Sequence, residues 1–329
     1  MRLAVLGCGQ IGRMYLEYLR QEGYDDVVCY DTVPEQAETA HGLVARSVEE
    51  VLALAPDAAL VTSATAAHAD LVSVLLSRRI PTFCEKPLTL DLKSTAEIGL
   101  LAEHTATMLW VGFHRRFDRD YAEIHHRART GELGEIRQLR LFSHDAACPP
   151  LERLKVSGSI FCDLMLHDFD ALRWLTGGEI EEISAWGTVL TTAGLRELND
   201  FDHVAATARI SGGALAVLTA GRTQPLGYDV RLEVPAAHDS LAAGCTPRSP
   251  LHGPADPAPP EAPYRDYRDR FESAYRDQLI AFLRAVSGLG VDERAGRWQD
   301  SYYALRAALA AERSARRGGI PVRLDDRPG

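Results

Sequence analysis

Three polar residues have types and a spacing that suit the oxidation of an alcohol. Asp163 and His167 are four residues apart, so a helix there would place both on one face. Lys86 lies between Glu85 and Pro87, directly after an apolar run. A histidine can take a hydroxyl proton near neutral pH, and a lysine ammonium can stabilise charge that develops on the reacting oxygen. The hydride acceptor that the reaction also needs must be a cofactor.

Both features also have simpler explanations, which these residues alone leave open. A lysine and a proline after a strand commonly form a solvated turn, and Asp163 could simply hydrogen-bond His167. The surrounding segment 161–175 carries leucines and a tryptophan, so one side of its predicted helix should be buried. Polar groups beside such a surface need partners or a ligand, and Asp170 can share their face.

The N-terminal segment predicts where a nucleotide cofactor binds. Gly7, Gly9 and Gly12 fit the pattern G-x-G-x-x-G between a short apolar run and an amphipathic stretch at 11–21. These glycines would allow a tight turn, a close approach of pyrophosphate and close packing of helix on strand. Asp31 comes nineteen residues after Gly12, where an acid would bind the adenosine ribose. A carboxylate there repels a 2′-phosphate and no arginine follows it directly, so we predict NAD over NADP. The simpler alternative for the whole segment is an ordinary strand–turn–helix that binds no nucleotide.

The elements that must position these residues fall into two groups. Up to about residue 115, apolar runs alternate with amphipathic stretches, which predicts a parallel, doubly wound sheet with helices on both faces. Ser47 and Glu50 have the spacing of a capping box before one of the helices. The predicted strands are residues 2–6, 26–30, 58–62, 82–85 and 107–111, and the other helices are 11–21, 66–77 and 91–104.

The middle of the chain is dominated by strands. After a helix near 119–129, a hairpin signal at Ser211, Gly212 and Gly213 joins two of them, which predicts an α+β domain on a large, mostly antiparallel open sheet. We therefore expect a dinucleotide-binding Rossmann domain at 1–117 and a substrate and oligomerisation domain at 118–329. The strands are expected at 136–143, 180–190, 203–210, 214–220, 228–234 and 320–324. The helices are expected at 161–175, 267–286 and 298–317, and a proline-rich loop is expected at 245–263. Helix 298–317 is expected to pack on the first domain.

Composition limits the partners. The 329 residues are 46% hydrophobic and 25% charged, and 46 acidic against 36 basic residues give a net charge of −10. This sign disfavours nucleic acid and anionic lipid, and no apolar stretch is long enough to span a membrane. The six cysteines form no Cys-x-x-Cys pair, so no metal site is predicted and a reduced, cytoplasmic protein is expected.

Together these motifs resemble the glucose–fructose oxidoreductase / inositol dehydrogenase / rhizopine-catabolism family. The matching segments are 7–12, 63–68, 84–88, 112–118, 163–170 and 275–282. Within the family, segments 155–161 and 226–231 are most similar to inositol 2-dehydrogenases.

The resemblance assigns roles to individual residues. It implies that Lys86, Asp163 and His167 are catalytic, with His167 as the proton acceptor. It also implies a homo-oligomer, a dimer or tetramer, formed through the free face of the open sheet. The implied cofactor-binding residues are Gly7, Gly9, Gln10, Ile11, Gly12, Asp31, Thr62, Ser63, His68, Glu85 and Lys86. The implied substrate-binding residues are Arg116, Asp145, Asp163, His167, Asp170 and Tyr228.

The expected activity is an NAD-dependent dehydrogenase of a cyclitol, most simply of myo-inositol to its 2-keto form. The sequence departs from the subfamily at Ser159, Leu226, 146–148 and 219–221, all on the substrate side. Those departures keep open a sugar or amino-cyclitol dehydrogenase with NAD or NADP in a biosynthetic pathway. A nucleotide-binding regulator without activity is the alternative from another class, and the presence of Lys86, Asp163 and His167 together disfavours it.

Overall fold

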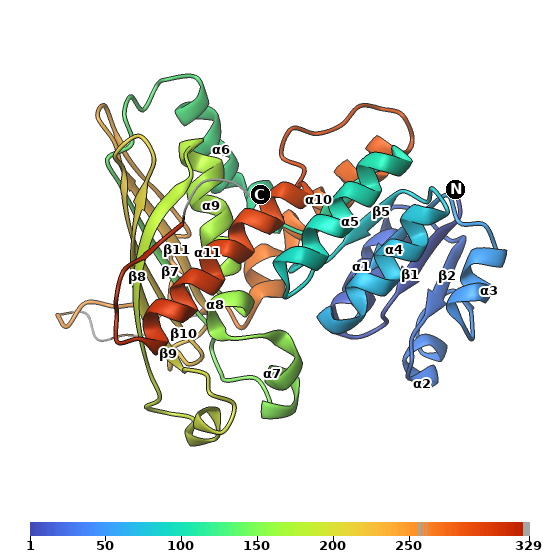
Figure 1. The fold of residues 1–329 in the computed structure, drawn as a ribbon, viewed down its shortest axis with the longest axis horizontal. Helices are drawn as coiled ribbons and strands as arrows, with labels where there is room; N and C mark the ends of the chain where they lie inside the picture. The colour runs from blue at the N-terminus through green and yellow to red at the C-terminus, as the bar shows by residue number, and fades with distance from the viewer. Residues whose placement is uncertain (256–257, 259, 261, 325–329) are drawn as a thin grey trace. The chain divides into compact units, whose positions relative to one another are not determined.

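The chain forms two compact units, seen in a computed structural model that describes residues 1–255, 258, 260 and 262–324 (Figure 1). The first unit comprises Met1–His114 and Tyr275–Tyr302. The second unit comprises Arg115–Ala274 and the chain from Tyr303 onward. Most of the helix at 267–286 therefore belongs to the first unit, whereas most of the helix at 298–316 belongs to the second.

A six-stranded parallel sheet forms the centre of the first unit, in the order β3-β2-β1-β4-β5-β6. The chain moves outward from β1 in one direction and then from β1 in the other. Since parallel crossovers are right-handed, this places helices on both faces, as a doubly wound sheet requires. The strands are β1 Leu3–Leu6, β2 Val27–Tyr30, β3 Leu43–Val44, β4 Ala58–Val61, β5 Thr82–Cys84 and β6 Leu109–Val111.

Local sequence explains where the helices of this unit begin. Asp91 accepts a hydrogen bond from the Ser94 amide and caps the helix that follows. Ser47 caps the helix at Val48–Ala53 as predicted, because its hydroxyl accepts a hydrogen bond from the Glu50 amide. The Glu50 carboxylate accepts from the Arg46 amide and not, as a capping box requires, from the Ser47 amide. The helices are α1 Gln10–Gln21, α2 Pro34–Glu38, α3 Val48–Ala53, α4 His68–Ser77 and α5 Leu92–Thr105, with a 3₁₀ turn η1 at Thr65–Ala67 and another, η2, at His114–Phe117.

Aromatic side chains bring the C-terminal part of the chain onto the first sheet. Phe83 of β5 packs against Tyr15 of α1 at 5.5 Å and against Phe282 at 5.8 Å between ring centroids. Phe282 lies on α10 (Tyr267–Val286), and it also contacts Trp110 of β6. Helices α1 and α10 therefore share a face of the sheet, although more than 250 residues separate Tyr15 from its hydrogen-bond partner Gln278.

A seven-stranded sheet forms the second unit, in the order β12-β11-β7-β10-β9-β8-β13. Neighbouring strands are antiparallel except β10 and β7, which are parallel. Gly212 and Gly213 both have positive φ and form the hairpin between β9 and β10 that the sequence predicts. The strands are β7 Gln138–His144, β8 Ile180–Thr188, β9 His203–Ile210, β10 Leu215–Gly221, β11 Asp229–Pro235, β12 Ser240–Ala243 and β13 Val322–Arg323.

Within the described residues, the helices of the second unit leave one face of its sheet without a covering layer. Buried and exposed residues alternate along β9 and β10, as they do in a sheet with one solvated face. The exposed face carries Trp186 and Leu215, which are 52% and 51% exposed. The helices are α6 Arg119–Arg129, α7 Leu151–Ser157, α8 Ile160–Asp163, α9 Leu166–Thr176 and α11 Trp298–Arg316, with a 3₁₀ turn η3 at Ala193–Arg196; α7 and β12 are not among the predicted elements.

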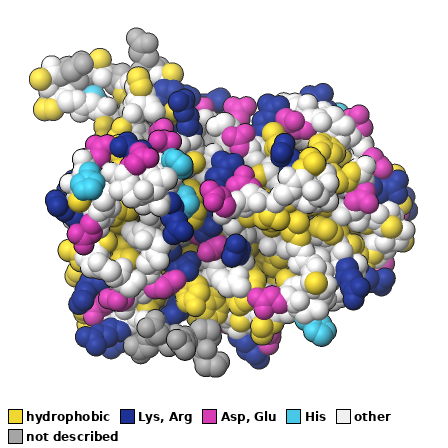
Figure 2. All heavy atoms as spheres, turned by 90° about the horizontal axis from the view of Figure 1, so that it is seen from above, with side chains coloured by type: hydrophobic (Ala, Val, Ile, Leu, Met, Phe, Trp, Pro, Cys, Tyr) yellow, Lys and Arg dark blue, Asp and Glu magenta, His cyan; other side chains and the backbone are white. Residues whose placement is uncertain are grey.

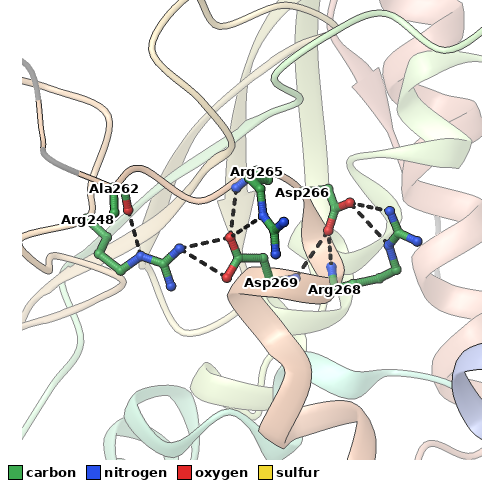
Figure 3. Close-up of polar contacts among 6 residues, drawn as sticks. All are labelled: Arg248, Ala262, Arg265, Asp266, Arg268 and Asp269. Atoms are coloured by element: carbon green, nitrogen blue, oxygen red, sulfur yellow. Dashed lines mark hydrogen bonds and ion pairs between the residues drawn. The ribbon is translucent and has the colours of Figure 1, made fainter. Parts of the chain in front are cut away.

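The two ends of the proline-rich stretch are held together (Figure 3). The Arg248 guanidinium donates to the carbonyl of Ala262 and to both carboxylate oxygens of Asp269, and it lies 4.1 Å from the ring centroid of Tyr264. Asp269 also accepts from the Arg265 amide. Of the predicted loop 245–263, residues 256, 257, 259 and 261 lie outside the described residues.

Surface charge is mixed in sign. Acidic and basic side chains are interspersed on the face drawn in Figure 2, so the net charge of −10 does not gather there into one acidic field. No helix in the described part of the chain combines the length and hydropathy that crossing a membrane requires.

Candidate active site

The glycine-rich turn after β1 is too tight for side chains at two of its three glycines. Gly7 has φ +105°, and a Cβ there would lie 2.3 Å from the Ser63 amide nitrogen. A Cβ on Gly12 would lie 1.9 Å from the Gly7 carbonyl oxygen, which also accepts a hydrogen bond from Thr62 Oγ1 at 2.6 Å. Around Gly9, by contrast, no described atom lies within 4 Å of the Cβ position. The turn thus closes on itself and leaves open space at Gly9, where a pyrophosphate would approach.

Asp31 is oriented by the same turn. One carboxylate oxygen accepts from the Cys8 amide at 2.7 Å, and the other accepts from the Val33 amide at 2.9 Å. The acid at the end of β2 is therefore fixed beside the glycine turn. Among the described residues, no side chain caps α1 at its N-terminus, and free amides at such a helix end favour an anion. These features fit the diphosphate and ribose of NAD.

Glu85 is a buried carboxyl group at the end of β5. Tyr15 Oη donates to Glu85 Oε1 at 2.8 Å, and the Lys86 amide donates to Oε2 at 3.1 Å. Gln278 Nε2 donates to Tyr15 Oη in turn. Burial raises the pKa of Glu85, and the bond from Tyr15 only partly opposes this. Glu85 therefore fixes the backbone that presents Lys86.

His68 connects the two turns that follow β4 and β5. Its Nδ1 lies 2.8 Å from the Pro87 carbonyl oxygen, and its Nε2 lies 3.1 Å from that of Ser63. The ring is buried, and burial lowers the pKa of His68 despite these two acceptors. Both ring nitrogens thus face backbone carbonyls, to one of which the neutral ring donates, and this suits a residue that orients the turn of Lys86.

The helix predicted at 161–175 is interrupted, which corrects the expected geometry of Asp163 and His167. Asp163 is the last residue of α8, whereas His167 lies in the first turn of α9. Between them the Met165 amide donates to the carbonyl of Ile160, five residues back, so the chain makes a wider turn than an α-helix. The two residues therefore do not occupy i and i+4 of one continuous helix. His167 is 7% exposed and Asp163 remains half-buried.

Two arginines form buried ion pairs with acids of α9. Arg116 donates to both carboxylate oxygens of Asp170, with Nε at 2.9 Å from Oδ2. Arg115 pairs with Asp168, and Ser143 donates to the same Asp168 oxygen at 2.8 Å. All four charged side chains are buried. The resemblance names Arg116 and Asp170 as pocket residues. In the structure they form an ion pair with each other, and this pair can hold α9 in place.

Asp145 and Tyr228 are held through their backbones. The Asp145 amide donates to the Gly221 carbonyl, and the Tyr228 amide donates to the Tyr264 carbonyl at 2.7 Å. The Tyr228 ring is buried, and burial raises the pKa of its hydroxyl well above the ordinary value. Tyr228 is therefore a neutral hydrogen-bonding group.

The named residues are divided between the units. Lys86 and the other residues expected to bind the cofactor belong to the first unit, and Asp163, His167 and the other expected substrate residues belong to the second. Sequence reasoning missed Tyr15, Gln278, Arg115 and Asp168. Buried polar partners of this kind leave no local signal, since their spacing in the chain is long.

The parallel sheet and the glycine turn define a dinucleotide-binding Rossmann domain, and comparison with known proteins identifies it as that of an oxidoreductase. Residues 1–113 match the family described as "Oxidoreductase family, NAD-binding Rossmann fold", and residues 121–241 match "GFO/IDH/MocA C-terminal domain". The chain belongs to the glucose–fructose oxidoreductase / inositol dehydrogenase / MocA family. It is therefore an NAD-dependent oxidoreductase.

Three similar proteins cover most of the chain. "Myo-inositol dehydrogenase Hyg17" of Streptomyces leeuwenhoekii is 49% identical over 98% of this chain and 99% of its own. "Myo-inositol 2-dehydrogenase" of Thermotoga maritima is 36% identical over 71% of this chain and 72% of its own. The crystal structure of a putative myo-inositol dehydrogenase from Sinorhizobium meliloti superimposes with a TM-score of 0.88 at 28% identity, over 99% of this chain and 100% of the other.

Proposed function

We propose that the chain is an NAD-dependent dehydrogenase of cyclitols that oxidises the C2 hydroxyl of myo-inositol to the 2-keto form. The observation that carries this proposal is the 49% identity, over 98% of the chain, to a protein named myo-inositol dehydrogenase. The presence of Lys86, Asp163 and His167 in the matching motifs supports it. The product would be scyllo-inosose, with the hydride delivered to NAD.

Each of the three residues has a chemical task in this proposal. When bound, the nicotinamide of NAD accepts the hydride. His167 takes the proton of the reacting hydroxyl as the general base. Lys86 donates a hydrogen bond to the same oxygen and stabilises its developing charge. Asp163 accepts a hydrogen bond from the neighbouring hydroxyl and so fixes the ring orientation.

The cofactor preference rests on Asp31. Its carboxylate would accept hydrogen bonds from the 2′- and 3′-hydroxyls of the adenosine ribose and would repel the 2′-phosphate of NADP. The other residues proposed to line the cofactor site are Gln10 and Ile11 of the first turn of α1, together with Thr62, Ser63 and His68.

The open face of the second sheet is proposed as the contact between copies of the chain in a cytoplasmic dimer or tetramer. Trp186 and Leu215 are large, apolar and half exposed on that face, and Val217 is 38% exposed beside them. Light scattering of the wild type and of Leu215→Glu tests this. We expect an oligomer that the charge weakens, and a monomeric wild type would contradict the proposal.

The experiment that tests the activity is NADH formation, followed by absorbance, with a panel of inositol isomers and pyranose sugars. Turnover with myo-inositol above the other isomers is expected. Preference for a glucose-type or amino-cyclitol substrate would instead establish the second candidate, a sugar or amino-cyclitol dehydrogenase.

One departure from the subfamily favours that second candidate. Ser159, where a second glycine is usual, donates its hydroxyl to Glu312 at 2.7 Å. This bond fixes the segment directly before α8, so the residues that lead into Asp163 differ from the subfamily pattern.

A further inference from the structure

A fully buried arginine lies behind Asp163. Arg222 directly follows β10, and its side chain is 0% exposed. Its Nη1 donates to Asp163 Oδ2 at 3.1 Å and its Nη2 donates to Asp200 Oδ2 at 2.9 Å. The Arg222 amide donates to the Asp202 carbonyl, so the backbone of this residue is also fixed. The guanidinium thus spans two carboxylates from different segments.

Asp200 connects this pair to the helix that carries Asp163. Its second oxygen accepts from the Ile160 amide at 3.0 Å, and Ile160 is the first residue of α8. A carboxylate at a helix N-terminus satisfies an amide that has no partner within the helix. Asp163 is therefore held twice, at its carboxylate by Arg222 and at the start of its own helix by Asp200.

Arg222 offsets one of the two negative charges that Asp163 and Asp200 bring to this cluster. Burial disfavours the charged guanidinium, but the two carboxylates outweigh it and the pKa of Arg222 is raised. A buried carboxylate that loses its partner is strongly disfavoured. The side chain of Asp163 keeps 21% exposure, whereas that of Asp200 has 7% and that of Arg222 has none, so Asp163 is the most open of the three to a substrate.

We propose that Arg222, supported by Asp200, is a positioning residue that fixes the carboxylate of Asp163 for the substrate hydroxyl. The inference rests on the proposed function, because it assigns Asp163 to the substrate. If this is correct, replacing Arg222 should lower turnover because Asp163 is no longer held in place, and it should leave nucleotide binding unchanged.

A double-mutant cycle tests this consequence. We expect Arg222→Gln to lower kcat/KM for the cyclitol by about 100-fold, since a small misplacement of a catalytic group can cost that much. Arg222→Lys should recover part of the loss, and Asp200→Asn should show a smaller one. In an Asp163→Asn background, Arg222→Gln should have little further effect, because the group it positions is already altered. The dissociation constant of NADH, measured by fluorescence, should stay within about twofold of the wild type in all variants.

Arg173→Gln is the matched control, since Arg173 forms a two-bonded pair with Glu179 in the same unit. It should change thermal stability more than kcat/KM. Additive effects of Arg222→Gln and Asp163→Asn, or unchanged kcat/KM in Arg222→Gln, overturn the positioning role. If Arg222→Gln does not fold, the cycle between Asp200→Asn and Asp163→Asn decides by the same criterion. Turnover by the wild type separates this result from failure of the proposed function, and no wild-type turnover with any cyclitol or pyranose overturns both.

Discussion

The two units hold most of their candidate site residues by different means, although Glu85 of the first unit also depends on the side chain of Tyr15. In the first unit, backbone groups at the ends of neighbouring strands fix the glycine turn and Asp31, through the bonds of Cys8 and Thr62. In the second unit, buried arginines fix the acids, as Arg116 fixes Asp170 and Arg222 fixes Asp163. Backbone contacts at parallel strand ends follow from the fold itself. Ion pairs between side chains depend on residue choice at distant positions.

This difference determines how far the residues of each unit can be replaced without loss of its site. The nucleotide turn allows little variation at Gly7 and Gly12, because a Cβ on either residue would collide with backbone atoms. The second unit can alter the placement of an acid by changing one partner. The departures that the resemblance to inositol 2-dehydrogenases implies all lie in this second unit. Variants of each unit test that contrast.

Replacing the proposed base should abolish turnover while leaving the first unit intact. We expect His167→Ala to lower kcat by about a thousandfold, the usual scale of general-base catalysis. NADH binding, measured by fluorescence titration, should stay unchanged. His126→Ala, an exposed histidine of α6, is the control and should behave as the wild type. Turnover that survives in His167→Ala would show that another group takes the proton.

Replacing Gly12 or Gly9 of the glycine turn by alanine should have different effects on stability and on NAD affinity. Gly12→Ala should lower both thermal stability and NAD affinity, the latter by about 100-fold, because its Cβ would meet the Gly7 carbonyl at 1.9 Å. Gly9→Ala should lower affinity by about tenfold and leave the melting temperature unchanged, since no described atom crowds that position. Calorimetry and NADH titration separate the two effects. Normal affinity in Gly9→Ala would refute pyrophosphate approach at this glycine.

Cofactor choice should depend on the charge of Asp31. Asp31→Ser should shift the ratio of kcat/KM for NAD over NADP by about tenfold toward NADP, because it removes both the ribose acceptor and the repulsion of a 2′-phosphate. Asp26→Ser, at the other end of β2, is the control. A wild type that already prefers NADP would contradict the assignment of Asp31.

The smallest effect should be a pH dependence of stability that originates at Glu85. Burial raises the pKa of Glu85 above its ordinary value of 4.5. The unfolded chain therefore ionises this group first, and the folded state loses stability as pH rises above about 4.5. The melting temperature of Glu85→Gln relative to wild type should rise between pH 5 and pH 7.5.

Glu17 provides a control of opposite sign. Its hydrogen bond from Arg20 lowers the pKa of Glu17 to about 2, so its contribution is present above the ordinary value and is lost as pH falls. Glu17→Gln should therefore lose melting temperature relative to wild type as pH rises from about 2 to about 4.5, and its difference from wild type should stay constant between pH 5 and pH 7.5. A rise for Glu17→Gln between pH 5 and pH 7.5 that matches the rise for Glu85→Gln would contradict the burial argument for Glu85.

Local patterns predicted many elements well and failed where tertiary contacts decide. Strand β9 and helix α6 begin and end at the predicted residues, because each has a clear period and flanking turn residues. Helix α10 has the predicted bounds, but it is kinked at Phe271, whose backbone is not helical. The predicted helix 161–175 was wrong in its continuity. The break falls at Leu164 and Met165, and no glycine or proline marks it. Strand β12 forms against β11, and four residues are too few for a pattern.

The sequence by itself determined the parallel sheet, the glycine turn with Asp31, and the residue types that oxidation of an alcohol needs. These depend on short spacings, which the period of a strand or helix and the freedom of glycine control. Only the tertiary structure decided which acids are paired and buried. Arg222 lies 59 residues from Asp163, and Gln278 lies 263 residues from Tyr15. Contacts at such separations form when β-strands and helices pack, so the chain order alone contains no local sign of them.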